Sequence, residues 1–127
     1  MRKLKLLSVG LFLSLIITGC NDTKEIETIK EGHLYMCPTA TVEEVVNGFM
    51  GDPSWESGIT EDGIKFVNIS GDITYAGKPV RAVIQFVFSK DGTSFEYNAF
   101  EINGVPQSQL MAAALLRKMC ESAKFIY

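Results

Sequence analysis

The stretch Val80–Phe88 constrains the fold of this chain more than any other. Every even-numbered residue in it is apolar, and the odd-numbered residues are an amphipathic mixture of Arg81, Val83, Gln85 and Val87. Side chains of a β-strand point alternately to its two faces, so this period predicts a strand with one apolar, buried face. Such a strand requires neighbouring strands and a second layer that covers its apolar face.

The sequence on either side of this strand also has β character. Residues 64–75 and 95–102 are rich in β-branched and aromatic residues, which strands favour. Turns at 76–79 and 90–93, the second containing Asp-Gly, separate the three segments. The apolar phase of the last segment shifts near Ala99, which indicates a bulge. Together these patterns predict an antiparallel meander of three to five strands.

Two amphipathic helices are expected around the strands. Thr41 and Glu44 fit a capping box, and apolar residues recur at helical spacing from 41 to 50. A second helix is predicted from Gln107 to Ser122. Strands flanked by helices indicate an α+β fold, in which the N-terminal and C-terminal helices pack on one face of the meander.

The N-terminal segment has the pattern of a secretory signal. Three cationic side chains precede the apolar run Leu6–Ile17, and small residues then lead into Cys20. The uncharged run is shorter than the roughly 20 residues that a membrane-spanning helix needs. A transmembrane helix and an ordinary cleaved signal are the two alternative interpretations.

The segment Ile17-Thr18-Gly19-Cys20 resembles the lipobox of bacterial lipoprotein precursors. The resemblance implies that residues 1–19 are removed as a signal peptide and that Cys20 becomes an acylated N-terminus. Acyl chains on Cys20 would then hold the protein on a membrane. Asn21 stands where an aspartate would resemble an inner-membrane retention signal, so the periplasmic face of the outer membrane is favoured if the source is a diderm bacterium.

A weaker resemblance covers about three quarters of the chain after Cys20. The segments concerned are 37–42, 55–58, 66–73 and 100–107. They look like small extracytoplasmic domains of bacterial membrane-attached proteins that have no assigned function. This resemblance implies membrane attachment and no known catalytic residues.

Charge and length limit the partners and the number of domains expected for the rest of the chain. After residues 1–19, the remaining 108 residues carry 9 basic and 15 acidic side chains, a net charge of −6. This balance argues against nucleic acid as a partner and against electrostatic adhesion to anionic lipids. Residues 20–32 are polar and predict a flexible tether before a single domain at 33–127. The spacing of Ile26 and Ile29 leaves a short helix as the alternative.

The two cysteines beyond Cys20 predict a disulfide. Cys37 and Cys120 would lie in an exported, oxidising compartment, where paired cysteines form bridges. The bridge would join the residues before the first helix to the end of the last one. His33 is the only histidine, so the cysteines do not form a zinc ligand set, and no metal or other cofactor is expected.

The amphipathic face of the central strand is the predicted docking surface for another envelope protein. It would combine Arg81, Val83 and Gln85 with Glu96 and Asn98 of the next strand. Trp55 is either a further partner-binding anchor or a residue that closes the edge of the core. The sequence therefore favours a membrane-anchored binding or assembly accessory without catalysis.

Two other functions remain open. A small envelope hydrolase would use paired carboxylates, for which Glu43, Glu44, Glu96 and Glu101 are the candidates. A ligand-binding domain would instead hold an apolar molecule between the sheet and the helices. A cleft would favour either of them, and a tightly filled core would disfavour both.

Overall fold

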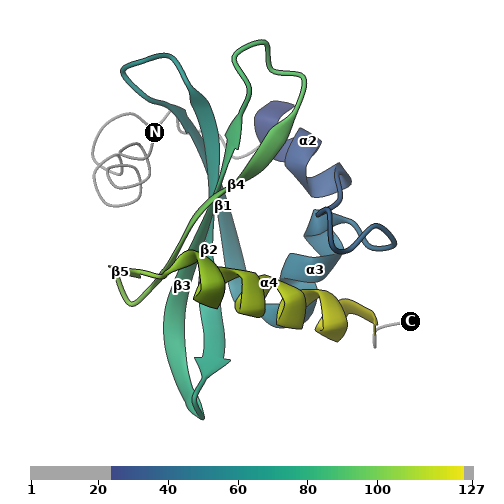
Figure 1. Ribbon diagram of the computed structural model, residues 1–127, viewed down its shortest axis with the longest axis vertical. Helices are drawn as coiled ribbons and strands as arrows, with labels where there is room; N and C mark the ends of the chain where they lie inside the picture. The colour runs from purple at the N-terminus through teal and green to yellow at the C-terminus, as the bar shows by residue number, and fades with distance from the viewer. Residues whose placement is uncertain (1–23, 125–127) are drawn as a thin grey trace.

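The structure, a computed structural model, describes residues 24–124. These contain α2 (Lys24–Glu31), α3 (Val42–Phe49), β1 (Gly51–Ile59), β2 (Lys65–Tyr75), β3 (Lys78–Phe88), β4 (Phe95–Ile102), β5 (Val105–Pro106) and α4 (Gln109–Lys124). The strands form one antiparallel sheet in the order β1-β2-β3-β4-β5. All three helices lie on the same side of the sheet (Figure 1). The predicted α+β meander is confirmed.

The core lies between the helices and the even-numbered face of β3. Ile84 is 1% exposed and is paired with Ile69 of β2 and Phe100 of β4. Phe86 is 2% exposed and forms an edge-to-face contact with Phe95, with ring centroids 5.7 Å apart. Buried side chains from α2, α3 and α4 complete the same cluster. The apolar face that alternation predicts is therefore the helix-covered face.

The segment before the predicted domain is a helix rather than a tether from Lys24 onward. Ile26 and Ile29 of α2 are fully buried in the core. Glu25 forms an ion pair with Lys65 at the start of β2, with an N–O distance of 3.3 Å. The prediction of a flexible tether over 20–32 is thus wrong for 24–31, because two apolar residues three apart suffice to dock a short helix. Residues 20–23 lie outside the described residues.

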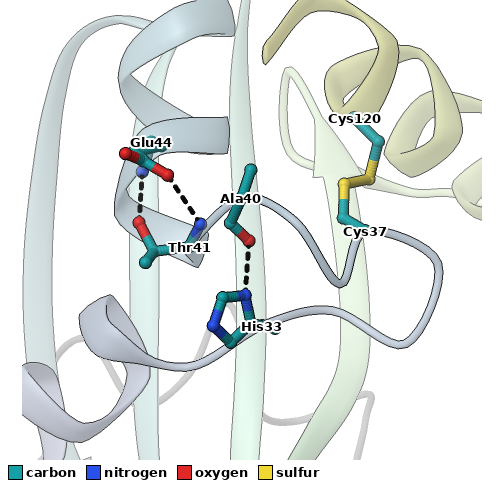
Figure 2. The surroundings of a disulfide bond; sticks show 6 residues. All are labelled: His33, Cys37, Ala40, Thr41, Glu44 and Cys120. Carbon is teal, nitrogen blue, oxygen red and sulfur yellow. Dashed lines mark hydrogen bonds between the residues drawn. A yellow bond between two sulfur atoms is a disulfide. The ribbon is translucent and has the colours of Figure 1, made fainter. Parts of the chain in front are cut away.

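The first predicted helix begins where its capping box indicates. The backbone N–H of Glu44 donates to Thr41 Oγ1 at 3.1 Å, and the N–H of Thr41 donates to Glu44 Oε1 at 2.9 Å (Figure 2). This reciprocal pair satisfies two backbone donors that a helix start leaves unpaired. The last helix, α4, starts later than predicted, at Gln109. The N–H of Gln107 donates instead to the carbonyl of Phe100 on β4, at 2.8 Å.

The predicted disulfide is present. Cys37 and Cys120 are bonded, with Cα atoms 5.7 Å apart, and each is 4% exposed. The bridge ties the loop before α3 to α4 (Figure 2). The same loop is held by His33, whose Nδ1–H donates to the carbonyl of Ala40 at 2.8 Å. The hydrogen bond of His33 is therefore a structural contact within this loop.

No described helix is both long enough and apolar enough to cross a bilayer.

Removal of the disulfide is expected to destabilise the domain strongly. The bridge closes a loop between residues 83 apart in sequence, and such native bridges contribute about 2–5 kcal/mol. Cys37→Ser should lower the free energy of unfolding by that amount, as measured by urea denaturation. Two thiols that react with alkylating reagent in the denatured, unreduced wild-type protein, beyond Cys20, would contradict the bridge.

Truncation of the core face of β3 is expected to be equally costly. Ile84→Ala and Phe86→Ala should each lower the free energy of unfolding by about 2–5 kcal/mol, because each leaves a cavity. Arg81→Ala, on the same strand but exposed, is the matched control and should change it by less than about 0.5 kcal/mol. Equal losses in the core variants and the control would contradict the assignment of faces.

Candidate binding surface

The face of the sheet opposite the helices carries most of the polar side chains that the sequence singles out. We call it the open face. In the register, Asn68 is paired with Gln85, Ser70 with Val83, and Asp72 with Arg81. The contribution of β4 includes Glu96 opposite Val87, Ala99 opposite Gln85, and Glu101 opposite Val83. The structure thus brings most of the predicted docking residues onto one face of three adjacent strands.

A ladder of three side-chain amides crosses this face. Asn98 Nδ2 donates to Gln85 Oε1 at 2.7 Å, and Gln85 Nε2 donates to Asn68 Oδ1 at 3.1 Å. Gln85 is 1% exposed and Asn68 is 6% exposed. The prediction that Gln85 is an accessible docking residue is therefore wrong. Its amide is buried because the flanking strands supply both hydrogen bonds, and buried polar groups are tolerated when so paired.

The ladder divides the open face into two parts. Toward the β1–β2 and β3–β4 hairpins, Phe66 is also buried, at 2% exposure. Toward the β2–β3 hairpin, Asp72 and Arg81 are exposed, while Ser70 and Val83 are half-buried. We call this second part, with Glu101, the exposed half. It is the portion of the predicted surface that solvent and partners can reach.

Arg81 is held in place over the exposed half. Its Nη2–H donates to Ser70 Oγ at 3.2 Å, and its Nη1 lies 3.8 Å from Asp72 Oδ1. Its backbone N–H donates to Asn103 Oδ1 at 3.0 Å. An exposed ion pair of this kind adds at most about 1 kcal/mol to stability. The contacts therefore orient the guanidinium more than they stabilise the fold.

Val83 and Glu101 form the rest of the exposed half. They face each other across β3 and β4, and both are half-buried. Partial burial raises the pKa of the Glu101 carboxyl above its usual range. An apolar residue and a partly desolvated acid beside Arg81 make a mixed surface. The composition of this surface is similar to that of transient protein interfaces, in which Arg is enriched.

Trp55 does not belong to the open face. Its register partner is Ile69, which lies on the helix-covered face, and its ring packs against the core. Lys30 Nζ of α2 lies 5.2 Å from the centre of the ring, within cation–π range. The structure thus places Trp55 at the edge of the core, as the alternative interpretation expects.

The candidate carboxylates are spread over both sides of the sheet. Glu43 lies 3.8 Å from Lys30 on the helix side, and Glu44 is part of the capping box. Glu96 and Glu101 share the open face, but their partners on β3 are four residues apart, which is about 13 Å along a strand. Paired hydrolytic carboxylates lie about 5–9.5 Å apart. The backbone therefore does not bring these four groups into one site.

The described residues offer little support for a metal site or for a site that binds an apolar ligand. Across residues 24–124, no three His, Cys, Asp or Glu side chains are grouped as a metal site. Side chains of the core cluster pack together between the sheet and the helices, where an apolar ligand would have to bind. Two pockets of about 150 and 160 Å³ lie near the β3–β4 hairpin.

Asn68 and Ser70 are site residues that the sequence prediction did not include. The two-residue length of the β2–β3 turn is the feature that would have identified them, because it sets the pairing of the two strands. Ala76 and Gly77 both have positive φ, +54° and +79°, as two-residue hairpin turns require. That turn pairs Tyr75 with Lys78, and counting back along both strands pairs Asn68 with Gln85.

No protein-family model, curated protein or solved structure matches this chain. The interpretation of the open face therefore rests on its own geometry and chemistry.

Loss of the central amide is expected to destabilise the protein. Gln85→Ala leaves Asn68 and Asn98 without their shared partner, so it should cost about 1–3 kcal/mol in a urea unfolding experiment. Glu96→Ala, on the same face but exposed, is the control and should cost less than about 0.5 kcal/mol. Equal effects of the two substitutions would show that the ladder is not a buried network.

Tyr97 predicts a specific alkaline weakening of the fold. Burial raises the pKa of its phenol to about 12, whereas a tyrosine in the unfolded chain ionises near about 10. Between these two values the unfolded state has lost the proton and the folded state has kept it, so stability falls as pH rises. Unfolding free energies measured across this window should fall less steeply for Tyr97→Phe than for the wild type. Identical slopes would contradict the burial of this phenol.

Proposed function

We propose that the protein is an exported, lipid-anchored binding module of the bacterial envelope. The exposed half of the open face binds another envelope protein, and Cys20 carries the acyl chains. The lipobox-like segment supports the anchor, with the outer membrane as the favoured location in a diderm cell. The buried Cys37–Cys120 disulfide supports an oxidising compartment outside the cytosol.

The oriented guanidinium of Arg81 is the observation that carries the binding proposal. The Arg81 side chain is 55% exposed, yet contacts with Ser70 and Asp72 restrict its guanidinium to one region of the surface. An arginine that is already ordered loses less side-chain entropy on binding than a mobile one. Arginine is also among the residues that dominate binding energy at interfaces. Val83 and Glu101 beside it supply an apolar contact and a second charge of opposite sign.

A charge reversal at Arg81 tests the binding surface. Affinity capture from detergent-solubilised envelopes should recover a specific protein with the wild type. Arg81→Glu should lower its recovery about tenfold or more, since a loss of 1.4 kcal/mol is already tenfold. Arg117→Glu, an exposed position on α4 and hence on the other side of the sheet, makes the same charge change and should retain the partner. Equal recovery with both variants would contradict the proposed surface.

Lipidation has a separate test. The wild-type chain should incorporate labelled palmitate in a bacterial host, and Cys20→Ser should incorporate none and accumulate as an unprocessed precursor. Cys37→Ser is the control, because its thiol is not part of the lipobox-like segment. Labelling of the Cys20→Ser variant would contradict the anchor.

A further inference from the structure

The short distance between the proposed anchor and the folded domain limits how the domain can sit on a membrane. This inference rests on the proposed function, because it takes acylated Cys20 as the point of attachment. Only three residues, 21–23, separate Cys20 from Lys24, the first residue of α2. The four Cα–Cα steps from Cys20 to Lys24 span at most about 14 Å, whatever conformation these residues adopt. The start of α2 is therefore held close to the bilayer surface.

The start of α2 is itself fixed to the domain. Its two isoleucines are fully buried, and the ion pair between Glu25 and Lys65 joins its first turn to the start of β2. A rigid helix start transmits the position of the anchor to the whole domain. A flexible tether of 13 residues, in contrast, would leave the domain free to rotate above the membrane.

One end of the sheet lies beside this helix start. Lys24, Glu25 and Thr28 share a pocket of about 160 Å³ with residues from β2, β3 and the β3–β4 loop. The residues from those elements are Lys65, Phe88, Asp91 and Gly92. Figure 1 shows α2 and the β1–β2 and β3–β4 loops at the same end of the sheet, with the β2–β3 hairpin at the other end. We call the first end the hairpin end.

We propose that the hairpin end contacts the lipid head groups of the bilayer, and that the exposed half points away from the membrane. The surface that meets the lipid consists of the loops 60–64 and 89–94 together with the start of α2. It carries both cations and anions, Lys90 and Asp91 among them. A surface of mixed charge is not drawn to anionic lipids, so the tether alone imposes the contact.

The length of β3 separates the two ends. Its 11 residues extend about 33 Å from Lys78 to Phe88. Arg81 is seven residues from Phe88, which places it about 23 Å from the hairpin end. The membrane thus covers the end that holds the anchor and leaves the exposed half accessible to a protein in the space beyond.

Two exposed lysines at opposite ends of the sheet provide the test. Lys90 lies in the β3–β4 loop and Lys78 lies at the β2–β3 hairpin. The full chain is produced in a bacterial host with labelled palmitate, and its acylated product is inserted into preformed phosphatidylcholine vesicles. A bulky, membrane-impermeant amine reagent is then added, and labelling of each lysine is followed by peptide mass spectrometry.

The control is the same chain with a 12-residue Gly/Ser insertion between Thr23 and Lys24, which adds about 20 Å of average reach. We expect Lys90 to react several-fold more slowly in the wild type than in the insertion variant, and Lys78 to react equally in both. Replacing part of the phosphatidylcholine with phosphatidylglycerol should leave the protection of Lys90 unchanged.

Three results would overturn the inference, and they are distinguishable. If the acylated protein shows no protection of Lys90, or protection of Lys78 instead, the orientation is wrong and the anchor stands. If Lys90 is protected only with phosphatidylglycerol, the contact is electrostatic and is not imposed by the tether. If the product carries no acyl chain, the proposed function fails and the orientation fails with it.

Discussion

The register between β2 and β3 is the constraint on which the rest of the structure depends. The two-residue turn at Ala76-Gly77 pairs the strands so that Ile69 and Ile84 meet on one face and Asn68 and Gln85 meet on the other. A shift of one residue would exchange these faces, burying the amides under the helices and exposing the isoleucines. The rest of the structure depends on this one alignment. It places the apolar face under the helices, which the disulfide between the loop before α3 and α4 holds together, and it places the amides on the open face.

The features that sequence alone could predict are those with a local or pairwise signal. The alternation in β3, the capping box at Thr41 and Glu44, and the Cys37–Cys120 pair each specify their structure through nearby residues or through elimination. The burial of α2 was not predictable in this way, because Ile26 and Ile29 give only a weak helical period and tertiary packing decides between helix and tether. The burial of Gln85 is not predictable from the sequence for a related reason. An amide on an amphipathic face is expected to be exposed unless its hydrogen-bond partners on both neighbouring strands are known.

These two corrections change the functional picture more than the confirmed elements do. The ladder removes Gln85 from the accessible surface and concentrates the docking proposal on Arg81 and its neighbours. The ordered α2 replaces a long spacer with a short connection to the proposed anchor, which turns membrane attachment into a constraint on orientation. Together they support the proposal of a rigid domain whose hairpin end faces the membrane and whose small, mixed surface points outward.

Site-specific photo-crosslinking in living bacteria tests this account most directly. A photoreactive amino acid replaces Arg81 in one strain and Arg117, on the opposite side of the sheet, in another. The account predicts that irradiation links position 81 to a specific envelope protein and that position 117 gives no such product. A product of the same partner from position 117 with none from position 81, or no product from either position in strains that contain the acylated protein, would contradict it.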